Sequence, residues 1–438
     1  MATYPMKQGL VLEFEWLASG PLDSSTRAGL AALSIWVNGK PANELEDIFA
    51  KTVRRSMRVS AHDLAIWLAA NWWRLRWEPQ RESLSWKMSH QIGAAGGGYA
   101  WPSLSFVSDG EFVSVIGQPS TDWGGAPVRY LNSIDEIISA REFELGIDHY
   151  VEAVLERLTS CHNVDSALID VWAAVCEERQ NPEQSNERKL EALLGYDPDE
   201  ASTSVIETLQ GMATYLGRGA IEEIASASQN DAMDHVNMLL EHQNNAIPAV
   251  VPERDYLCQK ISEIDRSQRP WQQGARSAAL VRNAWGIHAG EPIANKKLCD
   301  LIDIPGKILS GEADIEYCPM AAGFRNCADR DGLKLILTKH PITGRRFELA
   351  RLIGADLSAK TCETLLPVTN AKTTRQKFQR AFAQELLCPF VSLDEYFGGK
   401  IPDDDKIELA ADHFHVSPLL VKTALVNRGR LPRYELAV

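Results

Sequence analysis

Two segments in the last quarter of the chain hold the residues whose types and spacing could do chemistry. They read RRFELARLIGADL, starting at Arg345, and TTRQKFQRAFAQELLCPF, starting at Thr373, and both have helical spacing of apolar residues. Seven cations gather here, in a chain with a formal net charge of -14: Arg345, Arg346, Arg351, Lys372, Arg375, Lys377 and Arg380. Guanidinium and ammonium groups bind anions. The cluster therefore indicates a site for a phosphate or for a carboxylate of a partner, with Arg351, Arg375, Lys377 and Arg380 as candidate contacts.

The apolar frame of these segments resembles the core of the ImmA/IrrE family of zinc metallopeptidases. In that family a helix of the form RFxLAHELGHxL precedes a helix of the form ExEANxFAxxLLMP. The matching residues are Arg346, Phe347, Leu349, Ala350, Gly354 and Leu357, then Phe382, Ala383, Leu386, Leu387 and Pro389. The resemblance covers about residues 270 to 432, and it implies a mostly helical, zincin-like domain with a small sheet.

The residues that hold and use the metal in such a domain are missing from this chain. HExxH places two imidazoles one helical turn apart on one zinc ion, with a glutamate between them as general base. The corresponding residues are Arg351, Ala355 and Leu352, and Gln376 stands where the second helix supplies a carboxylate. A guanidinium has no lone pair for a metal, and leucine and alanine offer no donor. We therefore expect a retained scaffold with no catalytic residues, no metal and no cofactor.

Two interpretations of Arg351 follow from the sequence. Pointed into the former metal cleft, it would favour an anion. Paired with an internal acid such as Glu348 or Glu385, it would only join helices, and this structural interpretation is favoured. A displaced zinc site would have to use His340, His413, His415, Cys318 or Cys327, whose spacing is poor for one ion, and Cys388 has no nearby base that would make it a nucleophile.

A second candidate site lies near the other end of the chain, where tryptophans alternate with arginines. Rings that stack on bases beside guanidiniums that meet phosphates are typical of single-strand nucleic-acid binding. Trp73, Trp77, Arg74 and Arg76 are the candidate contacts, and Lys51, Arg54, Arg55 and Arg58 form a second basic group upstream. The alternative, which composition favours, is that the tryptophans fill a core. Gly96-Gly97-Gly98 lacks the GxxxxGK[ST] pattern of a phosphate loop and is expected to be a turn.

Length and composition limit the class of protein. A chain of 438 residues with 45% hydrophobic residues is long enough for two or three domains with real cores. Its start lacks the pattern of a secretory signal, and no run of about 18 apolar residues predicts a membrane span. The eight cysteines are dispersed without a CxxC pair, which favours reduced thiols and a cytoplasmic location.

The elements that must position these residues predict an α+β protein. Residues 1–130 are expected to form a mixed domain of helices and strands, 131–245 an acidic helical region, 246–270 a linker, and 271–438 the peptidase-like domain. Local signals include a turn at Asn38-Gly39, helix caps at Ser60 and Ser417, a capping box at Ser133 and Glu136 that would start a helix, and a weak point in that helix at Gly146.

These observations lead to one leading expectation and two alternatives. We expect a non-catalytic regulatory or assembly protein, built on a degenerate metallopeptidase domain and bound to a protein partner. The resemblance implies a prokaryotic stress, mobile-element or phage-defence context. The alternatives are a nucleic-acid-binding subunit of a larger effector complex and an active metallopeptidase with displaced ligands.

Overall fold

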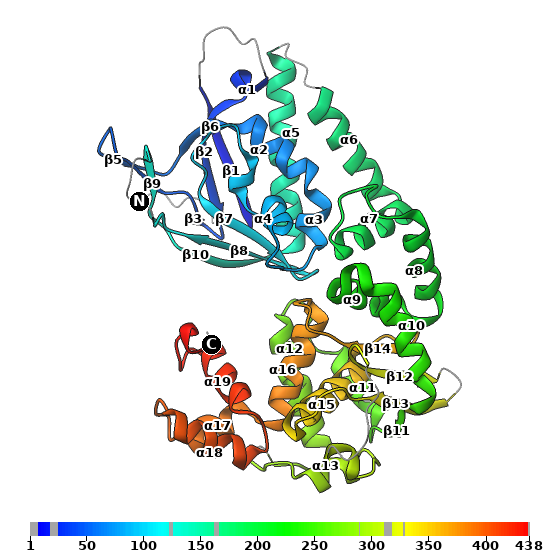
Figure 1. Cartoon of the computed structure of the whole chain (residues 1–438). Coiled ribbons are helices and arrows are strands. Elements are labelled where there is room, and N and C mark those ends of the chain that lie inside the picture. The colour runs from blue at the N-terminus through cyan, green and yellow to red at the C-terminus, as the bar shows by residue number, and fades with distance from the viewer. Residues whose placement is uncertain are drawn as a thin grey trace. The chain divides into compact units, whose positions relative to one another are not determined.

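The fold is described from a computed structural model of the whole chain (Figure 1), which describes residues 8–17, 25–121, 126–161, 166–288, 290–310, 318–326 and 329–436. The chain divides into two compact units, Met1–Ile206 and Glu207–Val438. The predicted acidic helical region, 131–245, is shared between them. Both units combine helices with β-sheets, so the α+β class predicted from the sequence is confirmed.

The described residues of the first unit form three antiparallel sheets. β2 (Leu30–Val37) lies between β1 (Leu10–Trp16) on one side and β3 (Lys40–Pro41) and β6 (Met57–Ser60) on the other. A second sheet has the order β10-β8-β7, and a third has the order β5-β4-β9. Their strands are β4 (Leu45–Asp47), β5 (Thr52–Arg54), β7 (Ser103–Ser108), β8 (Phe112–Gln118), β9 (Val128–Tyr130) and β10 (Ile134–Ser139). Asn38 and Gly39 have φ angles of 48° and 78°, which confirms the predicted turn between β2 and β3.

Helices complete this unit: α1 (Ser25–Ala28), α2 (Ala61–Ala70), α3 (Trp72–Trp77), α4 (Leu84–His90), α5 (Ala140–Ser160), α6 (Ser166–Gln180), α7 (Pro182–Leu194) and the start of α8 (Thr203–Leu216). Ser60 caps α2, as predicted. The predicted capping box at Ser133 was wrong, because those residues enter strand β10 and the box is formed by Ser139 and Glu142 at the start of α5. α5 also continues through Gly146, where a Cβ atom would lie 2.4 Å from the Leu10 carbonyl oxygen, so this glycine permits close packing against β1.

The second unit is built around one small antiparallel sheet of order β11-β13-β12-β14. The strands are β11 (Ile247–Ala249), β12 (Ala321–Asn326), β13 (Asp329–Ile336) and β14 (Leu365–Val368). Helices precede and follow them: α9 (Arg218–Ser228), α10 (Ala232–His242), α11 (Arg254–Ser262), α12 (Pro270–Ala284), α13 (Asn295–Leu301), α14 (Lys307–Ser310), α15 (Ile342–Ser358), α16 (Thr374–Leu387), α17 (Phe390–Tyr396), α18 (Asp404–Phe414) and α19 (Pro418–Asn427). Ser417 caps α19, as predicted.

The main apolar core of this unit lies on one face of the small sheet. Helix α16 packs between α12 and α15 there (Figure 1), and this group buries, among others, Leu349, Ile353 and Phe382. Arg325 of β12 points to the same face, because its guanidinium binds Asp356 of α15. The two segments singled out in the sequence therefore become neighbouring helices packed against one sheet.

Candidate functional site

The candidate site lies where α15 crosses α16 beside the edge strand β14. Gly354 makes the crossing close, since a Cβ atom at this position would lie 2.7 Å from Cδ1 of the buried Phe382 ring. Thr373 starts α16 because its side-chain oxygen accepts a hydrogen bond from the Gln376 amide nitrogen at 3.2 Å. Helix α15 thus presents Arg351 toward the first turn of α16, which carries Gln376.

Arg351 and Gln376 are in direct contact. Nη2 of Arg351 donates to Oε1 of Gln376 at 2.5 Å and to the Thr369 carbonyl oxygen at 2.7 Å, and Arg351 is only 6% exposed. The guanidinium therefore bridges α15, α16 and the loop after β14. Two positions that the resemblance assigns to ligands of one zinc ion are here joined by a hydrogen bond.

Gln376 also closes the free edge of β14. Its Nε2 donates to the Pro367 carbonyl oxygen at 3.2 Å, and its Oε1 accepts from the Thr369 amide nitrogen at 3.0 Å. One side-chain amide thus pairs with the carbonyl of one residue and the amide of the residue two further on, as a neighbouring parallel strand would. Gln379 adds a bond to the same Pro367 oxygen at 3.3 Å. An edge strand that would otherwise accept another strand is sealed by glutamine side chains.

The two remaining positions of the motif belong to the apolar core. Leu352, at the place of the general base, has no exposed surface, and Ala355 is 4% exposed. Neither has a group that can hold a proton or a metal. The site can therefore bind and bridge, but these positions supply no base that could activate a water molecule.

Arg351 is a buried cation without an internal acid as a partner. No carboxylate in the described ranges forms an ion pair with it. Glu348 instead accepts from the backbone of Thr338 and Lys339 at 2.9 and 3.0 Å, and Glu385 accepts from the Phe390 amide at 3.3 Å. The predicted pairing of Arg351 with Glu348 or Glu385 was wrong, because both acids are held by backbone groups elsewhere.

The environment of Arg351 disfavours its charge. Burial, and next the nearby guanidinium of Arg380, lower the pKa of Arg351 to about 9, so the group is still protonated at neutral pH. Arg380 reaches the same loop and donates to the Ala371 carbonyl oxygen at 2.7 Å. Burial lowers the pKa of Arg380 as well. Carbonyl oxygens, and not carboxylates, hold both cations.

The other cations of the cluster are not brought together. Arg345 donates to the carbonyl oxygens of Lys339 and Ile308, both at 2.6 Å, and Arg346 donates to Asn295 and to the Ile293 carbonyl oxygen. Arg375 forms an ion pair with Glu363, and Lys377 is half-buried on α16. Arg345 and Arg346 thus join α15 to other segments. The site keeps Arg351 and Arg380, with Arg375 nearby.

Sequence reasoning missed the acidic member of the site, Glu223 of α9. Its carboxylate accepts from the Thr373 hydroxyl at 2.8 Å and is 6% exposed. Burial raises the pKa of Glu223, and Arg375, Thr373 and Gln376 oppose this rise. A glutamate 150 residues before Thr373, within an acidic helical segment, gives no local signal of such a contact.

The residues considered for a displaced metal site do not converge. Cys318 is buried and its thiol donates to the Met320 carbonyl oxygen, His340 is exposed, and Cys327 lies outside the described residues. His413 packs against Tyr396, and His415 ends α18 in the left-handed conformation. In the part of the chain that the structure describes, no three histidine, cysteine, aspartate or glutamate side chains form a metal-binding group. Burial also raises the pKa of the Cys388 thiol to about 12, so the reactive thiolate is disfavoured.

The tryptophan and arginine segment is a core in this structure. Trp73 is 3% exposed, and its indole nitrogen donates to Glu178 at 2.7 Å. Arg74 donates to Glu78 at 2.8 Å, and Arg76 to Glu144 at 2.5 Å. Trp77 is half-buried and has the Arg76 guanidinium 3.8 Å from its ring centroid. The open stacking platform predicted as an alternative is therefore wrong for Trp73, because a buried ring cannot stack on bases, and both arginines are held by acids of the protein.

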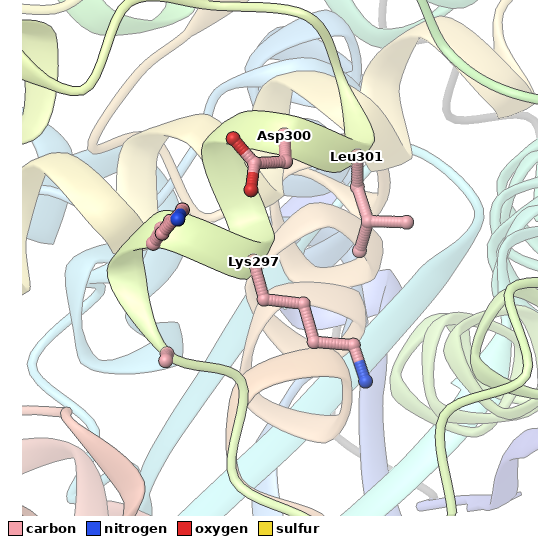
Figure 2. Close-up of a pocket in the computed structure, with 5 residues that line it drawn as sticks. Lys297, Asp300 and Leu301 are labelled. Carbon is pink, nitrogen blue, oxygen red and sulfur yellow. The ribbon is translucent and has the colours of Figure 1, made fainter.

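Two hollows on the second unit lie away from the Arg351 site. One, of about 450 Å³, is formed on α13, where Figure 2 shows Lys297, Asp300 and Leu301 around it. Lys297 is already bound to Glu291 at 2.6 Å. The other, of about 640 Å³, lies by β11 and β13 and is lined by Pro248, Phe324 and Lys334, among others. Neither brings together groups with a shared chemical role.

Comparisons of this chain with protein-family models, with curated proteins and with solved structures give no significant match. Among the described residues, no helix combines the length and the apolar character that crossing a membrane requires.

Proposed function

We propose that this chain is a non-catalytic regulatory or assembly protein whose C-terminal part is a degenerate metallopeptidase domain of ImmA/IrrE type. One observation carries the proposal. Arg351 and Gln376, which stand at two of the ligand positions, meet each other and bridge the two helices by a hydrogen bond. A guanidinium and an amide thus hold the helices where a metal ion and its ligands would hold them in an active enzyme.

The proposal explains why the scaffold persists without the catalytic residues. Gly354 and Phe382, two of the residues that carry the resemblance, form the close crossing of α15 and α16. Leu352 and Ala355 lie in the apolar core and add to its packing. A domain of this kind can bind a partner through its surface, while Arg351 and Gln376 hold α15 and α16 together by a polar contact. The resemblance supports a cytoplasmic, prokaryotic stress, mobile-element or phage-defence context, with a protein as the partner.

Restoring the motif tests the proposal directly. The variant Arg351→His, Leu352→Glu, Ala355→His, Gln376→Glu recreates all four positions on the existing frame. We expect about one zinc ion per chain in this variant and none in the natural protein, measured by metal analysis after dialysis. The matched control carries the same changes except Ala355→His, and should bind zinc at least about tenfold more weakly. Stoichiometric zinc in the natural protein, or a folded four-residue variant without zinc affinity, would contradict the proposal.

A partner is sought by purifying the tagged protein from its native host and identifying what remains bound. The expected companion is a protein that remains after nuclease treatment. Chelator-sensitive cleavage of that companion by the natural chain would instead favour the active peptidase.

Nucleic-acid binding remains a second candidate because one basic group is exposed. Lys51, Arg55 and Arg58 are exposed, and so is Phe49, which is 83% exposed and precedes Lys51 by two residues in the sequence. Proteins that bind single-stranded nucleic acid use exposed aromatic rings to stack on bases and cations to contact the phosphates. The test measures how well the protein retains a single-stranded oligonucleotide. Retention that falls steeply as salt rises would support this candidate. Phe49→Ala should then weaken the retention, whereas Trp73→Phe should not.

A further inference from the structure

Helix α9 covers the side of β14 that the main core leaves open. The last turn of α8, just before α9, is bound to the segment before β14: Thr364 donates from its amide to the Leu216 carbonyl oxygen at 3.1 Å and from its hydroxyl to the Tyr215 carbonyl oxygen at 2.7 Å. Further along, Glu223 binds Thr373 at the start of α16. The end of α8 and helix α9 together therefore touch both ends of the segment, from Thr364 to Thr373, that contains β14 and the loop of the Arg351 site.

This cover is separate from the main core. Ile221, Ile224 and Ala225 of α9 are buried, yet none belongs to the apolar core that α12, α15 and α16 form. Phe324 and Leu365 are also buried and also lie outside that core. They are paired across β12 and β14, so their side chains point to the same face of the sheet, opposite to that of Arg325. The small sheet thus has a main core on one face and a thinner layer on the other. Regions with a small separate core open locally at lower free energy than the whole domain.

The contacts between α9 and the site are polar and closely fitted. Glu223 is a buried carboxylate with which no cation of the described residues forms an ion pair. Nη1 of Arg375 is buried without a hydrogen-bond partner. A Cβ atom at Gly219 would lie 2.5 Å from Oε1 of Glu363 and 3.0 Å from that Arg375 nitrogen. Water would satisfy Glu223 and Arg375 on opening, so separation costs less than it would for an apolar contact of the same area.

We propose that α9 is a cover that opens as a unit, and that its opening admits a partner to the second face of the small sheet, beside Arg375. The class of partner follows from what α9 itself presents. Ile221 and Ile224 supply apolar contacts, and Glu223 supplies a carboxylate. A partner helix with an acidic residue among apolar ones fits the uncovered surface. The identity of the site as a partner site rests on the proposed function, whereas the opening of α9 does not.

Hydrogen exchange of the full chain tests the opening, with a matched pair of glycine variants. Gly219→Leu places a side chain against the Glu363–Arg375 ion pair, whereas Gly211→Leu lies in α8 at a position with nothing within 4 Å of a Cβ atom. We expect Gly219→Leu to accelerate exchange about tenfold or more in α9 and β14 together, with α12 and α15 unchanged and with Gly211→Leu like the natural protein. If Gly219→Leu does not fold, Glu223→Ala replaces it, because it removes the hydrogen bond between α9 and Thr373, and the same faster exchange in α9 and β14 is expected.

Access is measured with a labelled peptide that copies residues 212–230. It should bind the opened variant at least about tenfold more tightly than the natural chain, and a Gln at the position of Glu223 in the peptide should weaken it. Three results would overturn the inference. Hydrogen exchange could accelerate in α9 without β14, it could accelerate uniformly over the whole unit, or the opened variant could bind no peptide. Zinc content of the four-residue variant is unaffected by these results, so failure of the inference and failure of the proposed function are distinguishable.

Discussion

Replacing the buried guanidinium of Arg351 gives the sharpest test of the site as a structural joint. The acceptors of its two hydrogen bonds keep other donors after the change. Oε1 of Gln376 still accepts from the Thr369 amide at 3.0 Å, and the Thr369 carbonyl oxygen still has Arg380 at 3.4 Å. Removing the cation therefore leaves no buried acceptor without a donor, which is the usual cause of a large loss of stability.

The magnitude follows from two opposed contributions. Two hydrogen bonds from a charged donor stabilise the fold by about 3 to 6 kcal/mol in total. Against them, burial and next the nearby Arg380 guanidinium lower the pKa of Arg351 from 12.5 to about 9, a net penalty on the charged form of about 5 kcal/mol at about 1.4 kcal/mol per pKa unit. Arg351→Met, which keeps most of the volume and removes the charge, should therefore change the free energy of unfolding by less than about 1.5 kcal/mol. Arg351→Ala also leaves a cavity and should be about 2 to 4 kcal/mol less stable than the methionine variant.

The assay is urea unfolding followed by hydrogen exchange in α15 and α16, which reports on the second unit by itself. The two variants are compared with each other and with the natural chain at pH 7. A loss above about 3 kcal/mol in Arg351→Met, equal to that in Arg351→Ala, would refute the reasoning, because it would mean that the positive charge itself stabilises the fold.

Three further predictions concern packing and protonation. Gly354→Ala should lower the free energy of unfolding by about 1 to 3 kcal/mol because the new methyl group meets the Phe382 ring. Gly211→Ala, at an open position of α8, should raise it by up to about 1 kcal/mol. Chemical denaturation measures the free energy of unfolding of both variants. Burial lowers the pKa of His90 to about 4, below its ordinary 6.5, so the unfolded chain binds the proton more tightly and the free energy of unfolding should fall as pH drops from 6.5 to 4. This fall should be absent in His90→Phe. Equal slopes of stability against pH in the variant and the natural chain would contradict the assignment. Trp73→Ala should lower the stability of the first unit by about 3 to 5 kcal/mol without changing oligonucleotide binding, and the reverse result would restore the stacking platform.

The local signals in the sequence were reliable where the chain interacts with itself over a few residues. The Asn38-Gly39 turn and the caps at Ser60 and Ser417 were predicted because each depends on φ angles or a bond three residues away. The capping box at Ser133 failed although its spacing was correct, since pairing of Ile134–Ser139 with β8 overrides a local preference for helix. The same spacing recurs six residues later at Ser139 and Glu142, where β10 ends and the following residues are free to form α5.

The sequence by itself determined the α+β class, the two helices of the candidate site, and the absence of metal donors at Arg351, Leu352 and Ala355, because residue types and helical periodicity are local properties. Only the tertiary structure decided where the cations point. Arg351 binds Gln376 and Thr369, Glu223 reaches the site from a helix far along the chain, and Trp73 is buried with its indole nitrogen bound to Glu178. Burial and pairing depend on groups far along the chain, and a charged or aromatic side chain looks the same in sequence whether it faces water or a core.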